Sequence, residues 1–374
     1  MIRVVHVISD LSTGGAEVML AKLVGRMDTE RFANVVVSLT DKGDLGELLE
    51  RNGTPLYTLG FLRGRPRWSG LTELIRLLKL LRPTLMQTWL YHADLLGSIA
   101  SLVSGGPPVI WNVRCSDMDL RHYPLQTRMV VRLLALASRF PHAVVVNSQA
   151  GRAWHESLGF NPRRWRYIGN GFDLDEFRPN TAAKELLHSE LGLPADNIVI
   201  AHVARVDPMK DHLTLLAAAK RVVARRPNAR FLLIGQGTQD LKPLLEEHGL
   251  SDRAYLLGKR GDISKLLPGT DLVCLSSISE GFPNVLGEAM ACGVPCVSTD
   301  VGDARLIIGE TGLVIPPRDA EGLANAIVEL IDRGPEVRRE LGRAARRRIE
   351  AEYSLPCFIH RYQTLYAELS QSAS

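Results

Sequence analysis

Short β-branched runs alternate with amphipathic segments along almost the whole chain, and this alternation constrains the fold more than any other feature. A first series predicts strands at 3–9, 34–39, 56–59, 85–89, 109–113 and 143–147, with helices at 16–27, 45–52, 70–81, 93–104 and 125–138. A second series predicts strands at 197–203, 230–234, 254–257, 271–275, 296–298 and 312–314, with helices at 212–225, 238–248, 263–267, 283–292 and 320–333. Such alternation favours an α/β fold in which parallel sheets carry helices on both faces.

A turn-rich stretch separates the two series. At 374 residues the chain is too long for one typical core, so two domains are expected. Asn170-Gly171 is followed by Asp173 and by Pro179, which are turn-forming residues at the end of the first series. We therefore expect one Rossmann-like domain over residues 1–172 and a second over residues 173–356.

Basic residues are concentrated in the first half of the chain. Residues 1–175 contain 21 Lys and Arg against 15 Asp and Glu, and residues 51–166 contain 16 against 5. Such a patch attracts an anionic ligand or surface. Because no nucleic-acid-binding motif accompanies it, we expect no nucleic acid as partner and favour anionic lipid, with Arg63, Arg65 and Arg67 as contributors. The Arg-rich segment 335–350 is amphipathic and is interpreted as a solvated helix face.

The cysteines and the hydropathy pattern indicate a cytoplasmic protein. The five cysteines show no C-x-x-C or zinc spacing, which is typical of reduced thiols. The chain begins with a strand-like run and not with a signal peptide. No apolar run reaches the roughly 20 residues needed to span a bilayer. Any membrane contact is therefore expected to be peripheral.

Two carboxylates flank the start of a predicted helix late in the second series. Glu280 follows the strand at 271–275, Pro283 suits the first turn of a helix and Gly293 suits its end, so Glu280 should lie in a loop and Glu288 in the helix. The free N–H groups and the dipole of a helix N-terminus favour phosphate, and carboxylates accept hydrogen bonds from sugar hydroxyls. The pattern predicts a phosphorylated, polyhydroxylated ligand.

Two further segments have features of a phosphate site. Gly14-Gly15 lies between the first strand and its helix, where glycines allow close approach of a diphosphate, although a plain tight turn explains the pair as well. Arg205 and Lys210 lie in the loop after the strand at 197–203, at the carboxyl end of a predicted central strand. Arg offers a planar fork for phosphate oxygens and Lys a compact charge.

The segment from Glu280 to Gly293 resembles the E-x7-E signature of retaining glycosyltransferases of family 4 (glycosyl transferases group 1). Gly14-Gly15, Asn170-Gly171 and the Arg205/Lys210 pair match other family segments in the same order. The resemblance implies the GT-B fold, with two Rossmann-like domains facing an interdomain cleft. It also implies an acceptor-side first domain, a donor-binding second domain, and a last helix, about 357–374, that packs back onto the first domain.

The resemblance implies a role for each matching residue. Arg205 and Lys210 would neutralise the donor diphosphate, Glu280 would bind the transferred sugar and Glu288 the ribose. The segment 258–263 would hold the base, often uracil. The expected donor-binding set is Gly14, Gly15, Arg205, Lys210, Gly235, Ile263, Glu280, Gly281, Phe282, Pro283, Asn284, Val285 and Glu288.

The acceptor side departs from the family pattern. The family often has a His where this chain has Arg114, so a His-based acid/base role at that place is in doubt. Together with Arg205, Lys210 and Glu280, we expect Arg114 and His92 to act near the transferred sugar, although a structural role for His92 is equally compatible with the sequence. Asp117 is a further candidate. No D-x-D pair has a metal-site context, so we expect no metal ion and no other cofactor.

These features predict a metal-independent, retaining hexosyl- or N-acetylhexosaminyltransferase. It would move a sugar from a nucleotide donor, a UDP-sugar first of all, to a polysaccharide or lipid-linked glycan of the cell envelope. In the family mechanism, the leaving phosphate takes the acceptor's proton and no protein nucleophile is needed. Two alternatives remain: a nucleotide-sugar 2-epimerase of the same fold, and a non-catalytic glycan-binding relative. Epimerisation of a nucleotide sugar without any acceptor would identify the epimerase. A function that is unchanged in the Lys210→Ala variant would identify the non-catalytic relative.

Overall fold

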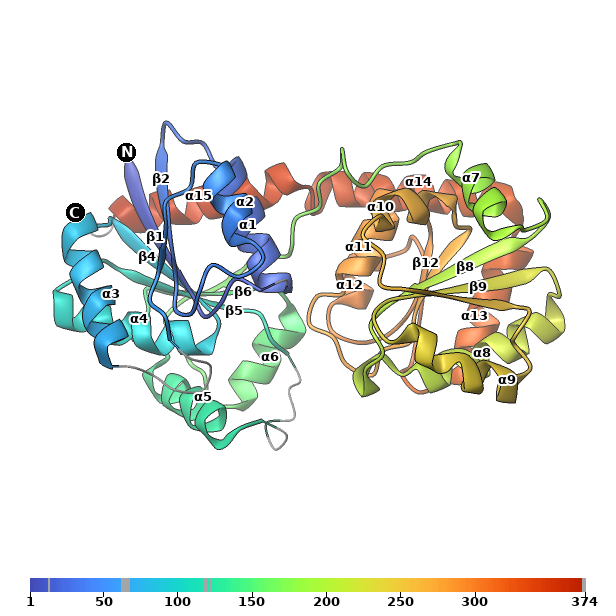
Figure 1. The fold of residues 1–374 in the computed structure, drawn as a ribbon, viewed down its shortest axis with the longest axis horizontal. Helices are drawn as coiled ribbons and strands as arrows, with labels where there is room; N and C mark the ends of the chain where they lie inside the picture. Colours follow the sequence, from blue (N-terminus) through green and yellow to red (C-terminus); the bar gives the residue numbers. More distant parts are fainter. Residues whose placement is uncertain (13, 62–67, 117–119, 121–122, 372–374) are drawn as a thin grey trace. The chain divides into compact units, whose positions relative to one another are not determined.

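The computed structural model describes residues 1–374 except 13, 62–67, 117–119, 121–122 and 372–374. The chain forms two compact units (Figure 1). Unit 1 comprises Met1–Gly171 and Leu355–Ser374, and unit 2 comprises Phe172–Ser354. Each unit is built on one parallel sheet, as the strand–helix alternation predicted. Arg63, Arg65, Arg67 and Asp117 lie outside the described residues.

Unit 1 contains a seven-stranded sheet in the order β3-β2-β1-β4-β5-β6-β7. The strand order reverses between β1 and β4, and in open α/β sheets ligands bind beyond the carboxyl ends of the strands at such a point. The strands are β1 Ile2–Ile8, β2 Phe32–Ser38, β3 Leu56–Thr58, β4 Leu85–Trp89, β5 Val109–Val113, β6 Ala143–Val146 and β7 Trp165–Tyr167.

Helices cover both faces of this sheet because alternate strand residues point to opposite sides. On β1, Val4 and Ile8 face one core and Val5 and Val7 face the other. The first core is covered by α1 Gly15–Arg26, α2 Gly46–Arg51 and α15 Leu355–Gln371. The second is covered by α3 Trp68–Leu81, α4 Tyr91–Ser104, α5 Leu125–Ala137 and α6 Gln149–Ser157.

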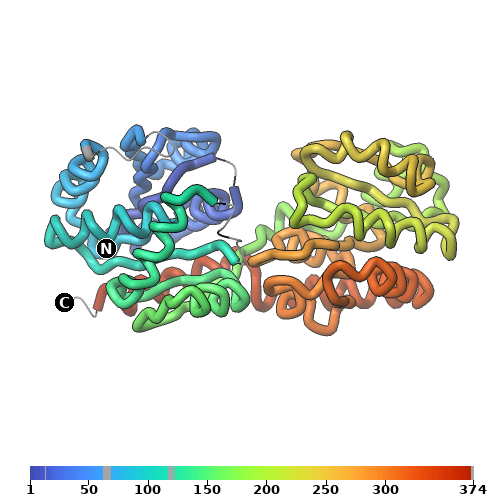
Figure 2. The backbone as a smooth tube through the Cα atoms, turned by 90° about the horizontal axis from the view of Figure 1, so that it is seen from below, coloured from blue at the N-terminus to red at the C-terminus, as the bar shows by residue number. Residues whose placement is uncertain are grey.

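The C-terminal helix α15 completes the core of unit 1, as the family resemblance implied. Phe358, Tyr362 and Tyr366 are buried against residues of β1 and β4. Figure 2 shows this red helix within unit 1, beside segments that lie far from it in the sequence. The aromatic rings of Tyr362 and Tyr366 lie 5.8 Å apart, and Trp89 stacks on Tyr362 at 6.2 Å.

Unit 2 contains a six-stranded sheet in the order β10-β9-β8-β11-β12-β13, with its reversal between β8 and β11. The strands are β8 Ile198–Val203, β9 Ala229–Ile234, β10 Ala254–Gly258, β11 Leu272–Leu275, β12 Cys296–Thr299 and β13 Leu313–Ile315. One core includes residues of α7 Ala183–Leu191, α10 Ile263–Leu266, α11 Asn284–Ala291, α12 Ala304–Ile308 and α14 Gly334–Glu352. The other includes residues of α8 His212–Arg225, α9 Lys242–His248 and α13 Ala320–Asp332.

Two sequence expectations for unit 2 need correction. The helix predicted over 238–248 is a 3₁₀ turn, Thr238–Leu241, followed by α9, whose first turn contains Pro243. Proline lacks the N–H that would continue the earlier turn and suits a helix start. The Arg-rich helix α14 is not solely a solvated face, because Arg338 and Arg346 donate to main-chain carbonyls at 2.8 Å (Ile331) and 2.6 Å (Phe177).

Candidate active site

The two loops at the reversal point of the unit 2 sheet meet through an ion pair. Lys210 ends the 3₁₀ turn Pro208–Lys210 after β8, and Glu280 lies in the loop after the neighbouring strand β11. The Nζ atom of Lys210 lies 2.5 Å from Oε1 of Glu280, and the two side chains are 24% and 13% exposed. Parallel strands end at the same edge of a sheet, which explains why residues 70 positions apart come together.

Two serines at the end of β11 hold this ion pair in place. Ser277 donates through Oγ to the same Oε1 atom of Glu280 at 2.7 Å. Ser276 donates through Oγ to the main-chain oxygen of Lys210 at 2.8 Å. The amide of Ile278 adds a main-chain hydrogen bond to Met209 at 2.8 Å. The cation and the carboxylate are therefore positioned by both side-chain and main-chain contacts.

Two buried histidines lie behind Ser276. His202 Nε2 is 3.3 Å from Ser276 Oγ, and the ring of His202 lies 4.9 Å from that of His212. Burial lowers the pKa of His202 well below its usual value, and the neighbouring His212 and Lys210 lower it further. Burial also lowers the pKa of His212. Both imidazoles are therefore neutral near pH 7, and the positive charge here is carried by Lys210.

The loop from Glu280 to Pro283 leads into the N-terminus of α11. Pro283 is the N-cap residue, and no side chain among the described residues caps this end through a hydrogen bond. Helix N-termini present free N–H groups that favour anions. Gly302 has φ +55° and backs the loop so closely that a Cβ atom there would overlap the carbonyl oxygens of Glu280 and Gly281. The amide of Asp303 donates to Gly281 O at 3.0 Å, which fixes the loop further.

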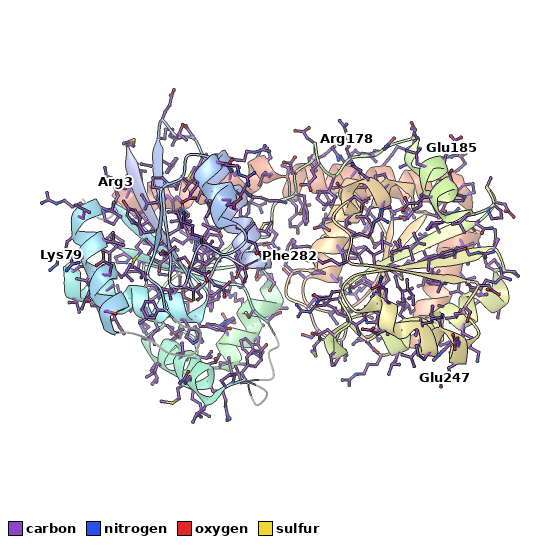
Figure 3. The ribbon with its side chains drawn as sticks, in the orientation of Figure 1. Arg3, Lys79, Arg178, Glu185, Glu247 and Phe282 are labelled. Atoms are coloured by element: carbon purple, nitrogen blue, oxygen red, sulfur yellow. The ribbon has the colours of Figure 1, made fainter. Side chains whose placement is uncertain are left out.

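The side chain of Phe282 has a structural role. Its ring is 7% exposed and packs against Phe172 at 6.2 Å and Tyr353 at 5.7 Å; its position is labelled in Figure 3. Gly287 lies so close to the Phe172 ring that a Cβ atom would overlap it. Any contact of Phe282 with a ligand would therefore use its main chain.

Arg205 and Gly235 form a second part of the site. Arg205 is 68% exposed and pairs with Asp207 at 3.3 Å, whereas Lys210 pairs with Glu280. Gly235 has φ +150°, and a Cβ atom there would overlap the carbonyl oxygen of Ala204. The amide of Val206 donates to Gln236 O at 2.8 Å. The backbone beside Arg205 is thus fixed, while its guanidinium reaches solvent.

The remaining predicted donor residues of unit 2 lie on α10 and α11. Glu288 is inside α11 and half-buried, as the sequence predicted for its position in the helix. Asn284 is the first residue of α11. Val285 and Ile263 pack against the core of unit 2, so their side chains contribute to the core.

In unit 1, Arg114 is held by its neighbours at the end of β5. Its guanidinium donates to Asn112 at 3.2 Å, Asn170 at 2.6 Å and Tyr362 at 3.0 Å, and it lies 4.8 Å from the Trp89 ring. The side chain therefore links β5 to the domain boundary and to α15. His92 is exposed in the first turn of α4.

The Gly14-Gly15 loop presents a carboxylate that the sequence analysis did not single out. Gly14 is the N-cap of α1 and Gly15 its first residue. The Glu17 carboxylate folds back so that a Cβ atom on Gly14 would overlap it, and the amides of Glu17 and Ala16 donate to it. Burial raises the pKa of Glu17, and Asp10 raises it further. Gly14 has no capping side chain and its own amide donates to Ser12 O at 2.9 Å, so no capping-box pattern marks Glu17 in the sequence and its position emerges only from the structure.

Other missed residues had weaker signals. Ser276, Ser277, His202 and His212 are short polar or aromatic residues at strand or helix ends, and their contacts appear only in three dimensions. Over the described ranges, no cluster of three His, Cys, Asp or Glu residues is arranged to hold a metal ion. All five cysteines are free thiols, three of them buried. Among the described helices, none is long and apolar enough to cross a bilayer.

Comparison with known families identifies both halves of the chain. Residues 13–176 match the model described as Glycosyltransferase Family 4, and residues 183–348 match the model described as Glycosyl transferases group 1. The chain is 25% identical over 381 positions to the UDP-Gal:alpha-D-GlcNAc-diphosphoundecaprenol alpha-1,3-galactosyltransferase of Escherichia coli, covering 98% of this chain and 97% of that protein. It is 30% identical to the N-acetyl-alpha-D-glucosaminyl L-malate synthase of Bacillus anthracis, over 49% of each chain.

Solved structures share the fold over the full length. The Anabaena Alr3699/HepE protein in complex with UDP superimposes with a TM-score of 0.86 at 24% identity, covering 98% of this chain and 100% of that one. Its complex with UDP-glucose gives a TM-score of 0.81 at 25% identity, with coverage of 98% and 100%. With both halves matched and the two-sheet architecture shared, the chain belongs to the family 4, group 1 glycosyltransferases of the GT-B fold.

Proposed function

We propose that this glycosyltransferase moves a hexosyl or N-acetylhexosaminyl residue from a UDP-sugar to a polysaccharide or lipid-linked glycan, with retention of anomeric configuration. The observation that carries the proposal is the 2.5 Å contact between Lys210 and Glu280, held by Ser277, beside the N-terminus of α11. A cation, a carboxylate and free helix amides are the groups needed to bind a diphosphate and a sugar at one place.

Positive charge at this place would stabilise the leaving group. As the bond between the sugar and the diphosphate breaks, negative charge grows on the phosphate oxygens. The Lys210 ammonium has three N–H groups, so it can contact phosphate while keeping its bond to Glu280. Arg205, on a fixed backbone with an exposed guanidinium, would close on the same phosphates. These charges support a mechanism that needs no metal ion.

The two carboxylates would orient the sugars. Glu280 accepts hydrogen bonds from Lys210 and Ser277 through Oε1, and its carboxylate would accept a hydroxyl of the transferred sugar. Glu288 would bind the ribose, and the segment that ends at Ile263 would hold the uracil. Gly14 and Gly15 of unit 1, the acceptor-side unit, would also face the donor. Retention would follow if the leaving phosphate takes the acceptor's proton on the face that it departs from.

Roles for Arg114 and His92 follow from their surroundings. Arg114 has a fixed guanidinium and would supply charge near the transferred sugar, while the exposed His92 is free to meet an acceptor. The named substrates of the Escherichia coli relative support a UDP-sugar donor and a diphosphate-linked lipid acceptor. A cell-envelope role on the inner face of the membrane would follow, with peripheral contact through the basic 51–166 region.

The test is a donor panel. UDP-, GDP- and ADP-sugars are each mixed with the purified protein, and slow hydrolysis and the melting temperature are followed, because bound ligand stabilises the folded state. We expect a UDP-sugar to be hydrolysed slowly and to raise the melting temperature, and we expect both effects to persist in EDTA. Once an acceptor is found, NMR should show an α-linked product from an α-linked donor. Loss of activity in EDTA, or inversion at the anomeric carbon, would contradict the mechanism.

A further inference from the structure

Helix α5 of unit 1 carries an apolar stripe on its outer side. Val131 and Leu134 are buried in the core of the unit, as expected for an amphipathic helix. The opposite side is also apolar, with spacings of four, four and three residues that place its members on one helix face. These members are Leu125 (65% exposed), Met129 (53%), Leu133 (48%) and Leu136 (85%).

The charge around this stripe has one sign. On a helical projection, Arg128 and Arg132 follow one edge of the stripe, within 100° of its centre, and Arg139 lies in the turn directly after α5. Residues 120–155 contain five Arg and no Asp or Glu, and one of these arginines, Arg152, forms an ion pair with Glu156. A surface with exposed leucines and flanking guanidinium groups is complementary to an interface that is anionic outside and apolar beneath.

A hollow lies at the C-terminal end of the same helix. Its volume is about 500 Å³, and Leu136 and Leu158 line it together with the two arginines 132 and 139. An apolar lining with guanidinium groups beside it fits a phosphate headgroup and its first methylene groups. Figure 1 shows α5 on the outer side of the layer of helices α3 to α6, which covers one face of the unit 1 sheet.

We infer that α5 is the surface by which unit 1 docks on an anionic lipid bilayer. The four apolar side chains enter the boundary between headgroups and acyl chains, and Arg132 and Arg139 bind lipid phosphates. The other Arg-rich helix, α14, differs from α5 in two ways. Its Arg338 and Arg346 donate to main-chain carbonyls, and the exposed large apolar residues of the described chain lie on other elements. The biological sense of this docking rests on the proposed lipid-linked acceptor, but vesicle binding is measurable without it.

The experiment uses the full chain and co-sedimentation with vesicles of phosphatidylcholine, with and without phosphatidylglycerol. We expect binding to the anionic vesicles, weakened about fivefold for each arginine removed in Arg132→Ser and Arg139→Ser. Leu133→Ser with Leu136→Ser should also release the protein. Matched controls are Arg343→Ser with Arg347→Ser, both exposed on α14, and Leu186→Ser with Leu213→Ser, both exposed in unit 2; these should bind like the parent.

Three results would overturn the inference. The first is equal binding by the α5 variants and the parent, and the second is no preference of the parent for anionic vesicles. The third is a dimeric parent that becomes monomeric on Leu133→Ser with Leu136→Ser, because α5 would then be an interface between two copies. Stabilisation of the α5 variants by UDP in a melting assay reports on the donor site separately, so failure of docking and failure of the proposed activity are distinguishable.

Discussion

Lys210 and Glu280 form an ion pair, with Nζ 2.5 Å from Oε1, that joins the ends of β8 and β11. The oxygen that accepts from Lys210 also accepts from Ser277, so the carboxylate is held from two sides. In the proposed function, the cation would bind a phosphate and the carboxylate would accept a sugar hydroxyl. Both side chains are largely but not fully buried, and an ion pair in such a place is weak evidence of a contribution to stability.

Lys210→Ala should remove most of the transferase activity while leaving the fold intact. Loss of one group that stabilises developing charge costs about 10²–10³-fold in kcat. The measurement is steady-state release of UDP, with circular dichroism to verify folding. Lys220→Ala, at an exposed position on α8, is the matched control and should retain full activity. A Lys210→Ala variant with parental kcat would refute the role of this cation.

Ser277→Ala should reduce activity more modestly. The variant loses one hydrogen bond to Glu280, which is worth about two- to tenfold in kcat/KM. A parallel fall is expected for Ser276→Ala, because the Lys210 main chain then loses its side-chain partner. Ser157→Ala, at an exposed serine of α6, provides the comparison. If Ser276→Ala and Ser277→Ala both match the parent in kcat and KM, the serines do not position the ion pair.

Gly302→Ala should destabilise unit 2 and reduce activity together. Left-handed backbone costs a non-glycine residue about 1–2 kcal/mol, and here the added Cβ atom would also overlap the carbonyl oxygens of Glu280 and Gly281. Gly192→Ala isolates the first cost, because Gly192 has φ +64° with open space around it. In urea unfolding, the free energy of unfolding of Gly302→Ala should therefore be well below that of Gly192→Ala. Equal stability of the two variants would show that the loop yields to the overlap.

The sequence predicted the fold well because strand–helix alternation is a local signal. It missed α6 Gln149–Ser157, β7 Trp165–Tyr167 and α12 Ala304–Ile308, which are only nine, three and five residues long. β7 has three half-buried residues, so its place in the sheet depends on pairing with β6.

The candidate site was predictable only in part. Lys210 and Glu280 carried a motif, whereas Ser277 contacts Glu280 within one loop that has no recognisable pattern, and His202 meets Ser276 from the neighbouring strand. Arg114 was singled out, but its bond to Tyr362 spans 248 residues and no spacing rule reveals it. Long-range contacts of single side chains leave no periodic trace in a sequence, which is why these partners emerged only from the structure.

Asp94→Asn should change how stability depends on pH. Burial raises the pKa of Asp94 from its ordinary 3.8 to about 8, although hydrogen bonds from Thr88 and the amide of Asn112 oppose the shift. Between about pH 4 and pH 8 the folded protein thus holds a proton that the unfolded chain has released. Stability from this group is complete below about pH 4 and is lost as the pH rises through 8.

The Asn variant keeps the shape and stays neutral, so its melting temperature relative to the parent should rise from pH 5 to about pH 8 and level off above it. His6 acts in the opposite direction, since burial lowers its pKa to about 4 and stability falls as the pH drops below 6.5. That contribution is common to both proteins and cancels in the difference. Asp252→Asn, at an exposed position, should give no such trend. Parallel curves for Asp94→Asn and the parent would mean that Asp94 is ionised in the folded state.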